Sequence, residues 1–115
     1  MIVEDNPWIA LALEEMLVEQ GLEIAGVADT IERALRPAVN DPLDLALLDV
    51  NIGDRKIDPV AEALTRRGTP FVFTTGCGRA GIPEAFRDRP IVEKPFYIEE
   101  ILKTLRDTLA ASSSG

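Results

Sequence analysis

The fold is decided by one stretch, Pro42-Leu43-Asp44-Leu45-Ala46-Leu47-Leu48-Asp49-Val50-Asn51. Its middle is a short, continuous apolar run, which is typical of a strand buried on both faces in a parallel sheet covered by helices. The run ends at the carboxylate of Asp49, and Asn51 and Gly53 follow as the chain turns away. Parallel α/β sheets bind and react at the carboxyl ends of their strands. We therefore take Asp49 as the candidate reactive group.

Four further apolar segments predict strands, at residues 1–3, 23–27, 71–74 and 90–93. Apolar residues at helical spacing predict helices between them and after them, over residues 7–21, 29–39, 57–68 and 98–109. Strands that alternate with helices in this way form a parallel, doubly wound α/β sheet. Residues 79–89 carry a glycine, a proline and only weak periodicity, so we expect the helix there to be short or irregular.

Local signals mark where two of the helices begin. Asn6-Pro7 predicts an N-cap followed by proline at the first helical position. Asp29 and Glu32 are three residues apart and predict a capping box at the start of the second helix. Pro37 falls inside the pattern of that helix, which predicts a kink or an early end.

Composition and charge limit the function. The chain has 115 residues, enough for one domain with a single core, and is 46% hydrophobic and 28% charged. Its net charge of −8 argues against nucleic acid or an anionic membrane as a direct partner. No apolar run approaches the roughly 20 residues that span a bilayer, and there is no basic-then-apolar leader. We therefore expect a soluble, cytoplasmic protein that does not contact the membrane.

Two residue types are scarce. Cys77 is the single cysteine, so no internal disulfide forms, and more often such a cysteine is a bystander than a redox switch. The chain contains no histidine, which excludes Ser-His triads, histidine metal ligands and a phosphohistidine carrier.

Polar side chains follow four of the predicted strands. Right-handed crossovers place the ends of the first, third, fourth and fifth strands at one edge of the sheet. Glu4-Asp5, Asp49, Thr75 and Lys94 are expected to meet there. This convergence is the main prediction that the sequence makes about function.

The chemistry of this group follows from its charge. Three carboxylates close together repel one another unless a cation lies among them. With only oxygen ligands to offer, Glu4, Asp5 and Asp49 suit a hard divalent ion, which we expect to be Mg²⁺, with the main-chain carbonyl of Asn51 as a further ligand. Asp49 would attack phosphorus and give an acyl phosphate, while the metal, the Lys94 ammonium and the Thr75 hydroxyl contact the phosphoryl oxygens.

The sequence resembles the receiver domains of two-component response regulators. Four segments carry the resemblance in the family's order and spacing: Val3-Glu4-Asp5-Asn6, Leu47-Leu48-Asp49-Val50-Asn51, Phe73-Thr74-Thr75-Gly76 and Glu93-Lys94-Pro95-Phe96. The resemblance implies a flavodoxin-like, five-stranded sheet of order 2-1-3-4-5 over residues 1–111, followed by a flexible tail at 112–115. It implies the following roles: an acidic metal pair at Glu4 and Asp5, a phosphoacceptor at Asp49, a metal carbonyl at Asn51, a switch hydroxyl at Thr75 and a phosphate-binding lysine at Lys94.

The resemblance also implies partners. The phosphoryl group would come from a sensor histidine kinase or a histidine phosphotransfer protein, and output would be contact with a downstream protein target. The resemblance also implies that the chain is not an enzyme. It would be a phosphoacceptor that assists its own phosphorylation and dephosphorylation.

A narrower resemblance is to receivers whose fourth strand ends in Phe-Ala-Thr-Gly and an aromatic residue. Here the run reads Phe73-Thr74-Thr75-Gly76-Cys77, with Thr74 for alanine and Cys77 for the aromatic. Such receivers often lack a regular fourth helix and resemble partners of a divergent class of sensor kinases. Many receivers also carry Tyr or Phe three residues before the lysine, where this chain has Ile91, so we expect switching through residues 76–89.

The sequence leaves two other functions open. An aspartate-nucleophile phosphatase is one, because Asp49-Val50-Asn51 is similar to an Asp-x-Asp motif, although Asn51 removes the general acid. The other is a receiver-like binding module that works without phosphorylation.

Overall fold

The computed structural model describes residues 1–53, 55–76 and 82–114 of the chain. A five-stranded parallel sheet of order β2-β1-β3-β6-β7 forms its centre. The strands are β1 (Ile2–Val3), β2 (Val27–Ala28), β3 (Ala46–Asp49), β6 (Phe71–Thr75) and β7 (Ile91–Glu93). This is the predicted α/β, flavodoxin-like fold with its predicted strand order.

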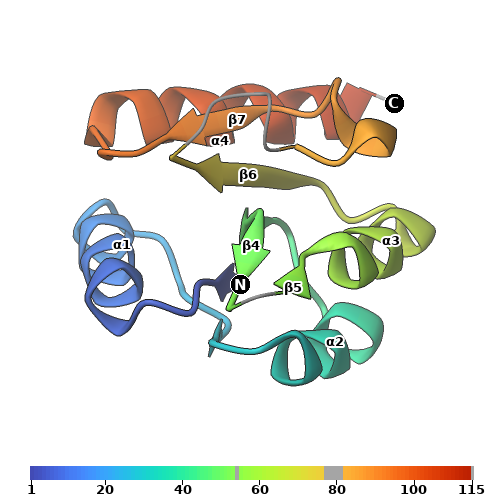
Figure 1. Cartoon of the computed structure of the whole chain (residues 1–115). Helices are drawn as coiled ribbons and strands as arrows, with labels where there is room; N and C mark the ends of the chain where they lie inside the picture. Colours follow the sequence, from blue (N-terminus) through green and yellow to red (C-terminus); the bar gives the residue numbers. More distant parts are fainter. Residues whose placement is uncertain (54, 77–81, 115) are drawn as a thin grey trace.

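Helices cover both faces of the sheet (Figure 1). They are α1 (Pro7–Glu19), α2 (Ile31–Asn40), α3 (Asp58–Arg67) and α4 (Ile98–Ser114). Helices α2 and α3 lie side by side and pack on one face, while α1 and α4 pack on the other. Each face encloses its own cluster of buried apolar side chains.

The central strand is buried along its whole length, as the apolar run predicted. All residues of β3 are buried. Leu48 points into the cluster beneath α2 and α3, whereas Leu47 points into the cluster beneath α1 and α4. A strand that contributes to two cores needs apolar residues at every position, which is why its sequence does not alternate.

Two strands are shorter than predicted, and both fall short at the same end. We expected a strand over 23–27 and a central strand beginning near residue 42, but β2 starts at Val27 and β3 at Ala46. Strand β1 lies between them and begins at Ile2, paired with Val27 and Leu47. The pairing with β1 thus begins at Val27 in β2 and at Leu47 in β3.

The predicted caps are confirmed for α1 and corrected for α2. The Asn6 side chain accepts hydrogen bonds from the backbone N–H groups of Trp8 (3.0 Å) and Ile9 (3.3 Å). At α2 the N-cap is Thr30, whose hydroxyl accepts from the Arg33 N–H at 3.1 Å. The predicted box of Asp29 and Glu32 is thus wrong by one position.

Helix α2 continues past its internal proline to Asn40, so the expected early end does not occur. Its last turn has a partner on the next helix. The Arg67 guanidinium donates to the carbonyls of Pro37 (3.3 Å) and Ala38 (3.0 Å). The Ala38 carbonyl has no helical partner, because residue 42 is a proline, whereas the Pro37 carbonyl also accepts from the Asp41 N–H at 3.0 Å.

A small hairpin follows the central strand, where the sequence indicates that the chain turns away. Strands β4 (Asn51–Ile52) and β5 (Arg55–Lys56) pair antiparallel. Further on, the segment 79–89 contains a single 3₁₀ turn, η2 (Glu84–Phe86), in agreement with an irregular fourth helix. Cys77 and residues 79–81 of that prediction lie outside the described residues.

The last helix runs to Ser114, so residues 112–114 of the expected flexible tail are helical. Over the described ranges, no helix combines the length and hydropathy needed to cross a bilayer.

Candidate functional site

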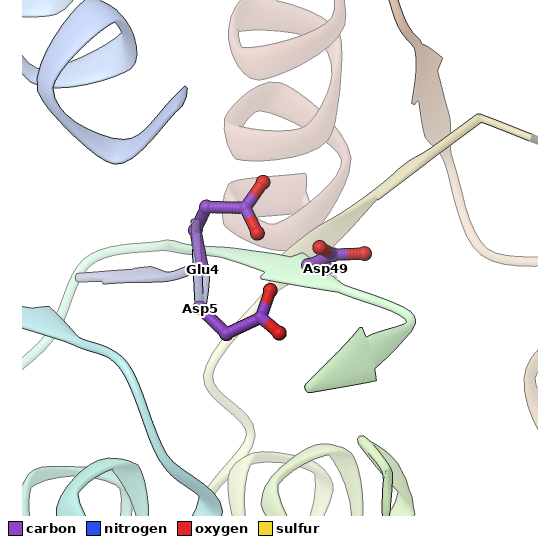
Figure 2. A group of neighbouring side chains, drawn as sticks. All are labelled: Glu4, Asp5 and Asp49. Atoms are coloured by element: carbon purple, nitrogen blue, oxygen red, sulfur yellow. The ribbon is translucent and has the colours of Figure 1, made fainter. Parts of the chain in front are cut away.

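The parallel pairing of β1 with β3 brings the acidic residues together. Ile2 aligns with Leu47 and Val3 with Leu48, so the residues that follow β1 lie beside the end of β3. Glu4, Asp5 and Asp49 each offer a carboxylate oxygen, and these oxygens lie within 4.8 Å of one another. Figure 2 shows the three side chains turned toward one region at this edge. The predicted convergence of these residues is therefore present.

The carboxylates differ in their exposure to solvent. Glu4 is 1% exposed and Asp49 is 7% exposed, whereas Asp5 is exposed. Backbone N–H groups hold all of them: Asn6 donates to Glu4 Oε2 (3.4 Å), Gly53 to Asp5 Oδ2 (2.7 Å) and Asn51 to Asp49 Oδ1 (3.3 Å). Two buried carboxylates and one exposed carboxylate thus form a pocket that opens on one side.

Lys94 brings the positive charge of the site. Its Nζ lies 3.0 Å from Glu4 Oε1 and donates to Asp49 Oδ2 at 3.2 Å. Its backbone N–H donates to the carbonyl of Thr75 at 2.8 Å, which joins the ends of β6 and β7. The Lys94–Pro95 peptide bond is cis.

One ammonium does not neutralise this group of carboxylates. Burial raises the pKa of Glu4 to about 7, and the neighbouring Asp49 carboxyl raises it as well, against the opposing effect of Lys94. For Lys94, burial lowers the pKa, but the nearby Glu4 and Asp49 carboxyls outweigh that effect and the pKa is raised. The pocket therefore retains an excess of negative charge, which favours a proton on Glu4 or a further cation.

The donor set fits a hard divalent cation. Each of the three acidic side chains offers oxygen, the ligand atom that Mg²⁺ and Ca²⁺ prefer. Oε1 of Glu4 is buried and forms an ion pair with the Lys94 ammonium at 3.0 Å. The same ammonium lies 3.2 Å from Asp49 Oδ2, so the two buried carboxylates share one counterion, and a further cation would stabilise them.

The other predicted site residues lie nearby. Thr75 is buried and is the last residue of β6, which pairs with β3 through Asp49 and Thr74. Asn51 follows Asp49 by two residues, is exposed, and turns its N–H toward the Asp49 carboxylate. Ile91 is partly buried at the start of β7.

One contact at the site was not predicted. The N–H of Gly53 holds the exposed Asp5 carboxylate from a position 48 residues away in the chain. Gly53 adopts a left-handed conformation with φ of 65°, which glycine tolerates best. The one feature of the sequence that points to this contact is a glycine in a polar turn just after the central strand.

No family model matches the chain. The transcriptional regulatory protein PdtaR of Mycobacterium tuberculosis is 32% identical over 109 residues, which cover 91% of this chain and 53% of PdtaR. The chain thus spans about half the length of this curated relative.

Solved structures match over nearly the whole chain. The solution structure of SdrG from Sphingomonas melonis Fr1 is 43% identical, with a TM-score of 0.83, and the match covers 94% of this chain and 92% of SdrG. The BeF3-activated conformation of SdrG, from Pseudomonas melonis Fr1, is 40% identical with a TM-score of 0.79, covering 94% and 92%. A CheY-like response regulator receiver domain protein from Methanospirillum hungatei JF-1 shares the fold at 21% identity, with a TM-score of 0.83, covering 98% and 94%.

The observed fold agrees with these likenesses. The chain belongs to the receiver-domain family of response regulators.

Proposed function

We propose that this receiver takes a phosphoryl group from a sensor histidine kinase or a histidine phosphotransfer protein onto Asp49. The observation that carries the proposal is the surroundings of Asp49. It lies at the carboxyl end of β3, between the acidic residues that follow β1 and the ammonium of Lys94 3.2 Å away. A carboxylate placed in this way has both a source of charge neutralisation and a donor for phosphoryl oxygens.

The transfer exchanges one bond to phosphorus for another. A carboxylate oxygen of Asp49 forms a bond to phosphorus while the bond from phosphorus to the donor's imidazole nitrogen breaks. The imidazole keeps the electron pair and takes up a proton. The product is an acyl phosphate on Asp49, which water can later hydrolyse.

A divalent cation, Mg²⁺ in this proposal, would supply charge neutralisation for the phosphoryl oxygens when bound. Glu4, Asp5, Asp49 and the main-chain carbonyl of Asn51 would hold it. The proposal is supported by the closeness of the three carboxylates, two of which share the ammonium of Lys94.

Lys94 and Thr75 act on the phosphoryl group once it has arrived. In the unphosphorylated protein the Lys94 ammonium is shared between Glu4 and Asp49. It would contact a phosphoryl oxygen after transfer, because the new group carries more charge than the carboxylate it replaces. The Thr75 hydroxyl, at the end of the adjacent strand β6, would contact another oxygen and carry the change to the surface.

Output is proposed to be contact with a downstream protein. PdtaR is named as a transcriptional regulatory protein, and it is about twice as long as the matched region. SdrG has a conformation that is described as BeF3-activated. These names support a regulatory domain with an activated conformation. That this change alters protein contacts, and does so in the cytoplasm, is part of the proposal.

The experiment incubates the protein with Mg²⁺ and acetyl phosphate and follows its intact mass and the phosphate released. A gain of one phosphoryl group that is lost in Asp49→Asn, with the fold unchanged by circular dichroism, supports the proposal. Label that persists in Asp49→Asn contradicts it. Rapid, continuous release of phosphate would indicate the phosphatase, and the absence of any reaction would indicate the phosphorylation-independent module.

A further inference from the structure

The hairpin of β4 and β5 connects the acidic pocket with helix α2. Directly after β4, the Gly53 N–H donates to Asp5 Oδ2 at 2.7 Å. In β5, the Arg55 guanidinium donates to Glu32 Oε1 of α2 and forms an ion pair with it. One short element therefore contacts both a proposed cation ligand and the surface of a helix.

The pairing of the two strands sets the direction of the side chains of β5. Ile52 aligns with Arg55, and Asn51 aligns with Lys56. Side chains of aligned residues in an antiparallel pair lie on the same face, and successive residues of a strand alternate between faces. Ile52 is buried in the cluster beneath α2 and α3, so Arg55 lies on the side of α2. Lys56 lies on the opposite face of the hairpin.

Asp5 depends on the hairpin for its position. Its side chain is exposed, whereas Glu4 and Asp49 are buried, so packing restrains Asp5 least of the three carboxylates. In the part of the chain that the structure describes, the Gly53 N–H is the one hydrogen-bond donor to the Asp5 carboxylate. A displacement of Gly53 would therefore move or release this carboxylate.

The position of Gly53 depends in turn on the contacts of the hairpin. Ile52 and Ile57 are buried and anchor the two ends of the hairpin in the core. Gly53 lies just beyond the last aligned pair, is exposed, and has a φ of 65°. The ion pair of Arg55 with Glu32 ties this outer part of the hairpin to a helix.

We propose that Arg55 and Glu32 are a positioning pair for the proposed cation site. Their ion pair fixes the hairpin, so that Gly53 holds the Asp5 carboxylate within reach of the ion. This role rests on the proposed function, since it concerns the same cation. The hydrogen bond from Gly53 to Asp5 forms without an ion, so the positioning of Asp5 can also be followed in the metal-free protein.

The test measures two quantities in Arg55→Ala and in Glu32→Gln. They are the hydrogen exchange rate of the Gly53 amide in EDTA, followed by NMR, and the Mg²⁺ dissociation constant, obtained by calorimetric titration. Each variant is expected to speed the exchange about threefold and to weaken Mg²⁺ binding about threefold, which is the size of effect that an exposed ion pair can have.

The sign of the Mg²⁺ effect in Arg55→Ala separates position from charge. Loss of a positive charge alone would tighten Mg²⁺ binding, so weaker binding reports a displaced ligand. Lys56→Ala is the matched control, because it removes the same charge from the same strand on the opposite face. It should leave the Gly53 exchange rate unchanged and bind Mg²⁺ as tightly as the parent or more tightly.

A charge exchange tests the pair directly. Arg55→Glu combined with Glu32→Arg restores an ion pair and should return Gly53 exchange toward the parent rate, whereas Arg55→Glu alone should not. Equal exchange of Gly53 in the parent and all variants would overturn the positioning pair. Faster exchange with unchanged Mg²⁺ affinity would also overturn it, since the ion would then not need this hold on Asp5. Absence of Mg²⁺ binding by the parent would instead contradict the proposed cation site itself.

Discussion

Among the described residues, Lys94 is the one cation in contact with both buried carboxylates, so its replacement separates metal binding from phosphorylation. We expect Lys94→Ala to bind Mg²⁺ more tightly, because a positive charge leaves the neighbourhood of the ligands. The same variant should accept phosphate from acetyl phosphate at least about tenfold more slowly, because a charged donor to the phosphoryl group is lost.

Calorimetric titration with Mg²⁺ and labelling kinetics measure these two effects. Lys103→Ala is the matched control, since Lys103 pairs with Asp107 on the exposed side of α4. A loss of Mg²⁺ affinity in Lys94→Ala would contradict the expected sign.

Glu4 is the carboxylate whose burial costs the most when no cation is present. Its pKa is raised to about 7 by burial first, so its ionisation opposes folding. A group with a raised folded pKa contributes stability that is present at low pH and is lost as pH rises through the folded value. In EDTA, Glu4→Gln should therefore be more stable than the parent at pH 8, by about 2 kcal/mol, and about equal to it at pH 5.

Denaturant unfolding at the two pH values measures the difference. Glu93→Gln, at an exposed position in β7, is the control and should change stability little at either pH. With Mg²⁺ added at pH 8 the parent should gain stability that Glu4→Gln does not. If Glu4→Gln is less stable than the parent in EDTA at pH 8, the cost of burying this charge has been overstated.

At the scale of the elements, the cap of α2 allows a prediction that distinguishes neighbouring residues. The Thr30 hydroxyl accepts from the Arg33 N–H, while Asp29 makes only an exposed ion pair with Arg33. Thr30→Ala should cost about 1 kcal/mol of unfolding free energy, and Asp29→Ala should cost roughly 0.5 kcal/mol or less. Urea unfolding of the two variants checks this order, and the reverse order would place the cap at Asp29.

Elements that depend on their own residues could be predicted from the sequence. Asn6 and Pro7 by themselves predict where α1 begins. The apolar residues around Leu48 by themselves predict β3. The order of the strands came with the family resemblance, whereas the meeting of Glu4 with Asp49 at one edge was predicted from the crossovers of a parallel sheet. The cap at Thr30 was missed because Asp29 and Thr30 are both good N-caps, and only the backbone path decides between them.

Other features depend on segments far apart in the chain and had no local signal. The position of β2 depends on its pairing with β1, in which Ile2 aligns with Val27, and the apolar residues around Ile24 do not show this pairing. The hydrogen bond from the Gly53 N–H to the Asp5 carboxylate joins residues that are 48 positions apart in the chain. Each needs the fold as a whole to be known before the contact can be inferred.

At the scale of the whole molecule, a bound cation should stabilise the fold. Binding to the folded protein alone adds about 1.4 kcal/mol when the ligand is at roughly ten times its dissociation constant. We expect the melting temperature to rise with Mg²⁺ and to fall to its starting value on addition of EDTA. Asp5→Asn, at the exposed ligand, should weaken the rise, and Glu15→Gln, an exposed residue of α1, should leave it intact. A melting temperature that does not respond to Mg²⁺ would contradict a cation site in this pocket.

Strand β1 has only two residues, yet it leads directly into both acidic residues of the pocket. Few backbone bonds hold it, so the ion that gathers Glu4, Asp5 and Asp49 would also clamp this end of the chain to the body of the domain. Susceptibility to proteases should then rise when magnesium is scarce, with the first cuts near the start of α1. The ion that permits signalling would in this way also set how long the molecule survives.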